Sequence, residues 1–159
     1  MLGIDPGLLA TGYGVLEILG TSVAVLDAGV IQTRAGRPLD ERIALIYDGV
    51  GTLLDKHSPD ALVVEDLYIE YRFPRTALLM AHARGVVCLA ARQRGVPVVP
   101  LAPAEVKRAI AGHGAAHKTQ IQRGVQRLLA LPELPRPSHV ADALALAWTG
   151  LYRVGGRRR

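Results

Sequence analysis

The stretch Leu2-Gly3-Ile4-Asp5-Pro6-Gly7 decides the fold, because a short apolar strand ends there in a carboxylate. The Asp-Pro-Gly turn leaves Asp5 at the end of the strand, and Gly12-Tyr13-Gly14-Val15-Leu16 begins a second strand after a hairpin loop over residues 6–11. An acid at the mouth of a sheet, beside a glycine-rich hairpin, can hold a metal ion and a phosphate. Asp before Pro-Gly also starts ordinary turns, so the other carboxylates decide between the two interpretations.

A second carboxylate, Glu65, closes the apolar run Ala61-Leu62-Val63-Val64. A run of this kind, without alternation, is typical of a central strand that is covered on both faces. Because a buried charge is costly unless it is paired or bound to a metal, we expect Glu65 at a strand end with a cation nearby. Asp66 follows at once and is expected to point to the opposite side of the strand, where it has a structural or supporting role.

A third carboxylate, Asp142, lies in an alanine- and leucine-rich segment that predicts a buried helix beginning near Ser138. His139 and Asp142 are three residues apart and therefore share one face of the first turn. Taken alone, they fit a solvated first turn, where Asp is favourable at the positive end of the helix dipole. Taken with Asp5 and Glu65, they favour a shared acidic site.

A series of motifs runs along the chain: Asp5-Pro6-Gly7 with Thr11-Gly12-Tyr13-Gly14, Val64-Glu65-Asp66-Leu67-Tyr68, Ala83-Arg84-Gly85-Val86, Glu105-Val106-Lys107, Lys118-Thr119-Gln120-Ile121-Gln122 and Ala141-Asp142-Ala143-Leu144-Ala145. In this order and at this spacing the chain closely resembles the Holliday junction resolvases of the RuvC type, from residue 2 to about residue 152. The resemblance implies an α/β, ribonuclease H-like fold, a mixed five-stranded sheet flanked by helices on both faces. It also implies a homodimer that nicks four-way junction DNA with divalent metal ions.

The resemblance further implies a set of site residues. The catalytic and metal-binding residues would be Asp5, Glu65, His139 and Asp142, holding two Mg²⁺ ions, with Mn²⁺ as an alternative. The family often has Asp where this chain has His139. Imidazole brings no negative charge and prefers softer metals than magnesium. We therefore expect activity to be retained, with manganese favoured over magnesium. The DNA-binding residues would be Tyr68, Arg72, Arg75, Lys107 and Lys118, with Tyr68 stacked on a base near the crossover. The implied protein partner is a junction branch-migration helicase complex.

The composition fits one domain with a polyanionic partner. The chain has 159 residues, of which 50% are hydrophobic and 4% aromatic, and 19 basic residues against 14 acidic ones give a net charge of +5. No apolar run approaches the roughly 20 residues that cross a bilayer, and no signal-peptide pattern is present, so we expect a cytoplasmic protein without a membrane partner. The single cysteine, Cys88, excludes an intramolecular disulfide and is expected to be buried in a helix.

Periodicity predicts the elements that carry these residues. We expect a nuclease domain over residues 1–153 and a basic, disordered tail over 154–159. Gly112-His113-Gly114 is interpreted as a helix C-cap followed by a turn, and the helix over residues 74–94 is the candidate dimer contact. The predicted strands cover 12–19, 22–32, 61–65 and 96–99 after the first, and the predicted helices cover 39–57, 74–94, 103–110, 117–130 and 138–152.

Other functions remain open at this stage. The same fold could carry a ribonuclease that acts on RNA or hybrid duplexes, because a fold alone does not fix the substrate. The chain could also be a junction-binding scaffold without catalysis, although three of the usual four carboxylates are intact. An actin-like ATPase would need two such halves around a nucleotide, and a single domain supplies one.

Overall fold

The computed structural model describes residues 1–66 and 74–155. In these residues the strands form one mixed sheet in the order β3-β2-β1-β4-β5. Strand β1 runs antiparallel to β2 and parallel to β4, and β4 runs parallel to β5. The mixed five-stranded sheet that the resemblance implies is confirmed. The strands are β1 (Leu2–Asp5), β2 (Ala10–Leu19), β3 (Ser22–Gln32), β4 (Leu62–Glu65) and β5 (Val98–Leu101).

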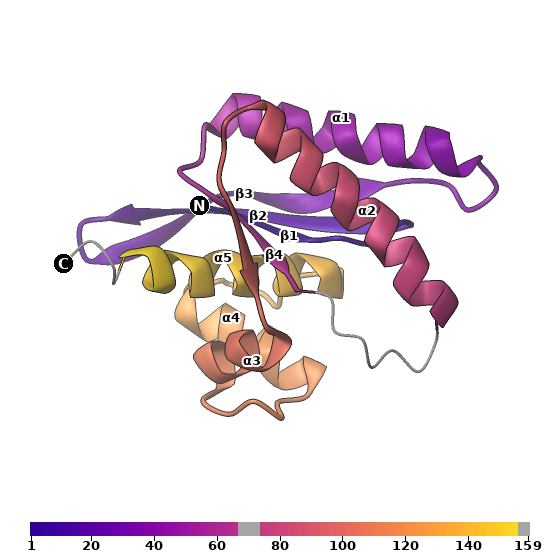
Figure 1. Ribbon diagram of the computed structural model, residues 1–159. Coiled ribbons are helices and arrows are strands. Elements are labelled where there is room, and N and C mark those ends of the chain that lie inside the picture. Colours follow the sequence, from indigo (N-terminus) through magenta and orange to yellow (C-terminus); the bar gives the residue numbers. More distant parts are fainter. Residues whose placement is uncertain (67–73, 156–159) are drawn as a thin grey trace.

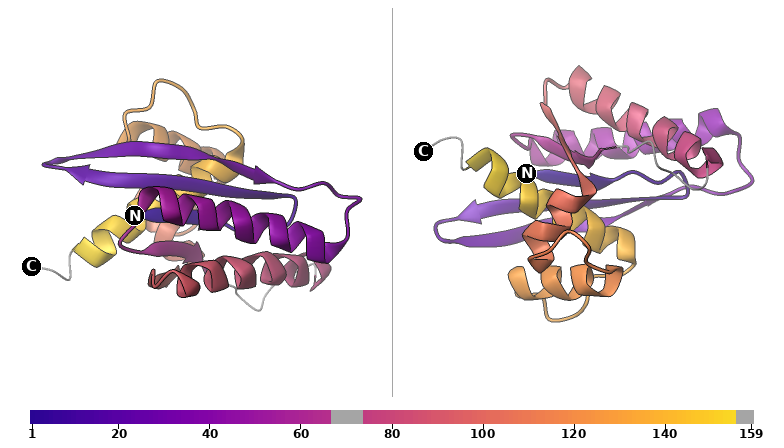
Figure 2. Two further views of the ribbon diagram at one scale, coloured as in Figure 1. Left: turned by 90° about the horizontal axis from the view of Figure 1, so that it is seen from above. Right: turned by 60° about the horizontal axis from the view of Figure 1, so that its bottom comes forward.

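Helices cover both faces of this sheet (Figure 1). Helices α1 and α2 lie over one face, whereas α5 lies along the other, with α3 and α4 beneath it, and the two views of Figure 2 show the same layers. Strand β4 is buried on both sides, since Val63 packs in the cluster with α5 and Val64 packs in the cluster with α1 and α2. No described helix has the length and apolarity that crossing a membrane requires. The helices are α1 (Leu39–His57), α2 (Pro74–Gln93), α3 (Pro103–Ala111), α4 (Lys118–Leu128) and α5 (Ser138–Gly155).

Glycines in β1 and β2 let α5 approach the sheet unusually closely. A Cβ atom on Gly3 would lie 2.1 Å from the carbonyl oxygen of Ala143. A Cβ atom on Gly12 would lie 2.1 Å from the carbonyl oxygen of His139. Both distances are far inside van der Waals contact, so any side chain at either position would push the helix away. The backbone of α5 is thereby fixed near the end of β1, where Asp5 stands.

Strand β5 differs from its prediction. We expected it over residues 96–99, ended by Pro100, whereas it covers Val98–Leu101 and contains Pro100. A proline cannot donate a ladder hydrogen bond, but β5 is the edge of the sheet and Pro100 needs no partner on its open side.

Other boundaries move by a few residues. Strand β2 begins at Ala10, so the hairpin loop is shorter than predicted, and α5 continues to Gly155 rather than ending near residue 152. Helix α4 is shorter than predicted, because His117 is its N-cap and the helix ends at Leu128. The C-cap prediction at Gly112 is confirmed by its left-handed backbone, with a φ of 84°. The residues 156–159 of the predicted tail lie outside the described part of the chain.

Cys88 is only partly buried, which corrects the expectation of full burial. The buried stripe of helix α2 does not include Cys88. It consists of Ala83, Val87, Ala90 and Ala91. Cys88 stands between Val87, which belongs to this stripe, and Leu89, which is 49% exposed, so it lies at the margin of the buried stripe.

Candidate active site

Asp5 and Glu65 end two neighbouring parallel strands. Strands β1 and β4 pair in register, with Ile4 opposite Val64, so the next residue on each strand is the carboxylate. Because parallel strands have their carboxyl ends at one edge of the sheet, the two acids emerge side by side there. This is the arrangement that the two apolar runs predicted.

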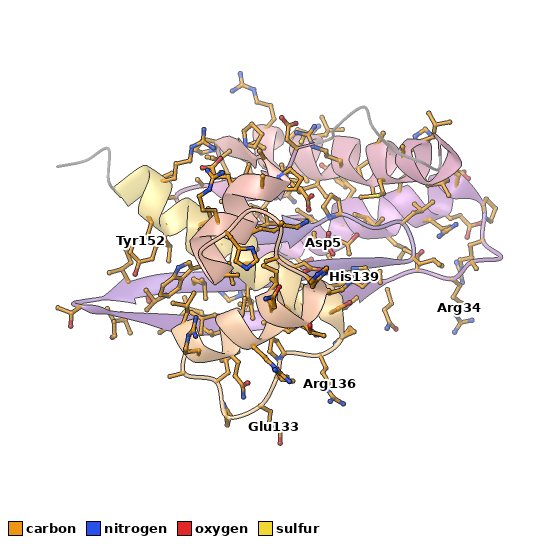
Figure 3. The ribbon with its side chains drawn as sticks, turned by 90° about the horizontal axis from the view of Figure 1, so that it is seen from below. Asp5, Arg34, Glu133, Arg136, His139 and Tyr152 are labelled. Carbon is orange, nitrogen blue, oxygen red and sulfur yellow. The ribbon has the colours of Figure 1, made fainter. Side chains whose placement is uncertain are left out.

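Helix α5 brings the other two residues to the same edge. The Nδ1 atom of His139 lies 2.7 Å from the Oδ2 atom of Asp5. Figure 3 shows this pair together, with Tyr152 at the far end of the same helix. Asp142, one turn further along α5, is close enough to Asp5 for the negative charge of Asp5 to raise the pKa of Asp142. The structure therefore gathers all four predicted catalytic residues around one edge of the sheet.

The surroundings of this cluster raise the pKa of two of its acids, Glu65 and Asp142. Burial is the main cause that raises the pKa of Glu65 to about 7, and the negative charges of Asp5 and Asp142 add to it. Burial also raises the pKa of Asp142, with Asp5 as the next cause. A strongly shifted carboxyl beside other acids is typical of a functional site rather than of a structural ion pair.

Two lysines oppose this accumulation of negative charge. The Nζ atom of Lys118, at the start of α4, lies 3.5 Å from the Oδ2 atom of Asp142. Lys107 of α3 lowers the pKa of Glu65 and lines a cavity of about 70 Å³ together with Glu65 and Asp142. Both lysines were predicted as DNA contacts, and the structure places them beside the carboxylates. A phosphate that enters the site would meet them there.

The donor chemistry of the cluster fits divalent metal ions. As the side chains lie, the described residues contain no group of three or more His, Cys, Asp or Glu arranged to hold a metal ion. The imidazole of His139 is hydrogen-bonded to Asp5, and the ammonium group of Lys118 pairs with Asp142, so groups of the chain itself stand at these two carboxylates. The carboxylates of Glu65 and Asp142 lie close to other negative charges, which add to the effect of burial in raising their pKa values. Carboxylate oxygens are the ligands that hard divalent cations prefer.

The remaining predicted residues fall into two groups. Tyr68 and Arg72 lie outside the described residues, and Arg75 lies in the first turn of α2 with its side chain outside the described part. Asp66 follows Glu65 directly, and its Oδ1 atom accepts a hydrogen bond from Arg84 at 3.3 Å. That position agrees with the supporting role expected for Asp66.

Sequence reasoning missed the role of Arg84. Its Nε atom donates a hydrogen bond to the backbone carbonyl of Glu65 at 3.1 Å, and its Nη2 atom bonds Asp66. Arg84 thus ties α2 to the end of β4 and fixes the direction in which Glu65 leaves the strand. The motif around Arg84 was visible in the sequence, but its partner, a backbone carbonyl, leaves no signal there.

Comparisons with known proteins agree with this geometry. Residues 1–150 match the family model described as crossover junction endodeoxyribonuclease RuvC. The protein of that name from Rhodopirellula baltica is 45% identical over 152 residues, which cover 96% of this chain and 85% of the relative. The one from Moorella thermoacetica is 46% identical over 147 residues, which cover 92% and 87%. The structure of Thermus thermophilus RuvC in complex with a Holliday junction substrate matches with a TM-score of 0.89 and 39% identity, over 98% of this chain and 94% of that one. These matches confirm the ribonuclease H-like fold.

Proposed function

This chain belongs to the RuvC family and is a crossover junction endodeoxyribonuclease, and we propose that Asp5, Glu65, His139 and Asp142 are the residues with which it cuts. The observation that carries the proposal is the convergence of these residues from β1, β4 and α5, with His139 bonded to Asp5 at 2.7 Å. In this proposal the enzyme resolves Holliday junctions by symmetric nicks in opposing strands. The products carry a 5′ phosphate and a 3′ hydroxyl.

The nucleases of this family depend on metal ions, and we assign two Mg²⁺ ions to each site, with Mn²⁺ also accepted. Asp5, Glu65 and Asp142 offer hard oxygen ligands, which Mg²⁺ prefers, whereas the nitrogen of His139 favours Mn²⁺. When bound, such ions supply an activated water and a positive charge for the leaving 3′ oxygen.

The residues of the chain position and neutralise the reacting groups. In the neutral imidazole, an Nδ1 proton donated to Asp5 leaves Nε2 as an acceptor, which can take a proton from the attacking water. Lys118 and Lys107 lie beside Asp142 and Glu65, where their charges reduce the repulsion between the acids and the scissile phosphate. These roles require His139 to be neutral and the two lysines to be charged.

Paired nicks require two sites related by symmetry. A Holliday junction has near two-fold symmetry, and a symmetric homodimer would present one site to each of two opposing strands. Helix α2 supports this role, since Leu78 and Leu89 are 65% and 49% exposed on it. We also assign DNA contacts to Tyr68, Arg72 and Arg75, and a branch-migration helicase complex as the protein partner, both from the family resemblance.

A cleavage assay separates this function from its alternatives. Four-way DNA junctions and a DNA–RNA hybrid duplex of the same sequence are incubated with wild type and with Asp5→Asn, in Mg²⁺ and in Mn²⁺. We expect symmetric nicks in the junction by wild type only, with the hybrid left intact. Preferred cleavage of the hybrid would indicate a ribonuclease. Junction binding without cleavage in either metal would indicate a non-catalytic scaffold.

A further inference from the structure

A second hollow opens beside Asp5 and His139. Its volume is about 460 Å³, and it lies between the β1–β2 loop, the β3–α1 connection and α2. It shares no lining residue with the small cavity at Glu65 and Asp142. Asp5 and His139 therefore stand between two spaces, one beside the other acids and one that the proposed cleavage reaction does not use.

The walls of this hollow are mostly apolar, and two of their leucines are exposed to solvent. Leu9 at the tip of the β1–β2 loop is 55% exposed, and Leu79 on α2 is 36% exposed, while Leu8 and Met80 complete the wall. Single exposed leucines are ordinary on protein surfaces, but these surround one concave space next to the catalytic residues. The hollow falls within the range of about 300–1,000 Å³ that is usual for small-molecule sites.

One cation, Arg42, lines this hollow. Its Nε atom donates a hydrogen bond to the Oγ1 atom of Thr33 at 3.0 Å, and the backbone N–H of Thr33 donates to the carbonyl of Leu9 at 2.9 Å. These two bonds hold the guanidinium at the loop. Among the described residues, Thr33 is the only hydrogen-bond or ion-pair partner of the Arg42 guanidinium, so both Nη groups keep donors for a ligand. An apolar wall with a fixed arginine suits a flat, apolar-faced group that carries a phosphate.

We propose that this hollow receives the base of a nucleotide adjacent to the cleaved phosphate, with Arg42 on a neighbouring phosphate. The proposal rests on the proposed function. Because the hollow shares Asp5 and His139 with the cleavage site, its occupant must be close to the scissile phosphate along the same strand. A base can enter only when it is unstacked and unpaired, and this costs least where pairing is already interrupted, as at the crossover of a four-way junction. The site would thereby select the crossover over continuous duplex.

A double-mutant cycle between protein and DNA tests the proposal. Junctions carrying one abasic nucleotide at either side of the cleaved phosphate are compared with intact junctions, in single-turnover cleavage by wild type and Leu9→Ser. At one position we expect the missing base to slow wild type by roughly 5- to 100-fold, the range for losing one base contact. Leu9→Ser should be slowed on intact DNA, and the abasic site should then add less than about twofold.

Matched variants control for general effects on charge and surface. Leu45→Ser changes a leucine that is 44% exposed on α1 outside the hollow, and it should keep the full abasic effect. Arg42→Gln should reduce the slope of log affinity against log salt by about one. Arg37→Gln, whose arginine pairs with Glu41 at 2.9 Å, should leave the slope unchanged.

A binding measurement keeps the test independent of cleavage. With 2-aminopurine at the sensitive position, and with EDTA to prevent cutting, fluorescence should rise when wild type binds the junction and should not rise with Leu9→Ser. Equal abasic effects in wild type and Leu9→Ser, or no fluorescence change with wild type, would overturn the base site and leave the hollow to another occupant, such as an apolar segment of a second copy. Failure of wild type to cut intact junctions would instead overturn the proposed function.

Discussion

The imidazole of His139 and the carboxylate of Asp5 are joined by a hydrogen bond of 2.7 Å between Nδ1 and Oδ2. The bond links the start of α5 to the end of β1, and it is the main cause that raises the pKa of His139. When His139 is protonated, it supplies Asp5 with a counter-charge. A divalent cation must compete with that proton, and metal binding is therefore expected to weaken as the pH falls.

The first prediction is that Glu65 lowers the stability of the fold at neutral pH. Its pKa of about 7 in the folded protein exceeds its ordinary value of 4.5, so deprotonation favours the unfolded chain as the pH rises through this window. Without metal, Glu65→Gln should raise the free energy of unfolding by about 2–4 kcal/mol at pH 8 and by little at pH 4. Urea unfolding at both pH values measures the difference.

The control for this prediction is Glu133→Gln, because Glu133 is exposed in the loop before α5. It should change the stability equally little at both pH values. Addition of Mg²⁺ or Mn²⁺ at pH 8 should stabilise wild type more than Glu65→Gln, because the metal binds the carboxylate. If Glu65→Gln is no more stable than wild type at pH 8, the carboxylate is better solvated than its burial indicates.

The second prediction concerns cleavage by the acid variants. Asp5→Asn, Glu65→Gln and Asp142→Asn each remove one oxygen ligand while keeping the size of the side chain, so each should abolish junction cleavage. Junction binding rests on cations spread over a wide surface and should persist, or even tighten as repulsion of the phosphates falls. Cleavage rates and gel-shift affinities measure the two effects separately. Near wild-type cleavage by any one variant would exclude that residue from the metal site.

The convergence of Asp5 and Glu65 could be predicted from sequence because their positions follow from local rules. Asp5 and Glu65 each end an apolar strand, and parallel strands expose their ends at one edge. The partner of Lys118 could not be predicted, because its contact with Asp142 depends on how α4 packs beneath α5. The need for glycine at position 12 could not be predicted either, because it also depends on helix packing. The atom that excludes a side chain there is the backbone oxygen of His139.

The third prediction tests this close approach. Gly12→Ala places a Cβ atom where the carbonyl oxygen of His139 lies, at 2.1 Å, so α5 must shift away from β2. Overpacking of this kind costs about 1–3 kcal/mol, and the shift would also displace His139 and Asp142. The variant should unfold at a lower temperature than wild type and should cleave junctions more slowly. Gly36→Ala is the matched control, since nothing lies within 4 Å of its Cβ position, and it should behave as wild type.

The fourth prediction separates the two roles of Lys118. Lys118→Ala should reduce the slope of log affinity against log salt by about one, if the lysine also contacts a phosphate. The positive charge of Lys118 lowers the pKa of Asp142, so its loss should raise that pKa further and move the acid-side decline of cleavage to higher pH. Lys56→Ala serves as the control, because Lys56 pairs with Asp27 at 2.8 Å, outside the site. An unchanged slope and an unchanged pH profile would place Lys118 outside catalysis and DNA binding.

The last prediction concerns His139, which must be neutral to accept a proton or to bind a metal. Because its hydrogen bond to Asp5 raises the pKa of His139, cleavage should fall with decreasing pH from above the ordinary value of 6.5. His139→Asp replaces the imidazole with a hard oxygen ligand, so it should stay active, gain magnesium activity relative to manganese and lose the histidine part of this decline. His139→Ala should be severely impaired with either metal. Cleavage rates measured across pH in both metals provide the test, and full activity of the alanine variant would show that three carboxylates suffice.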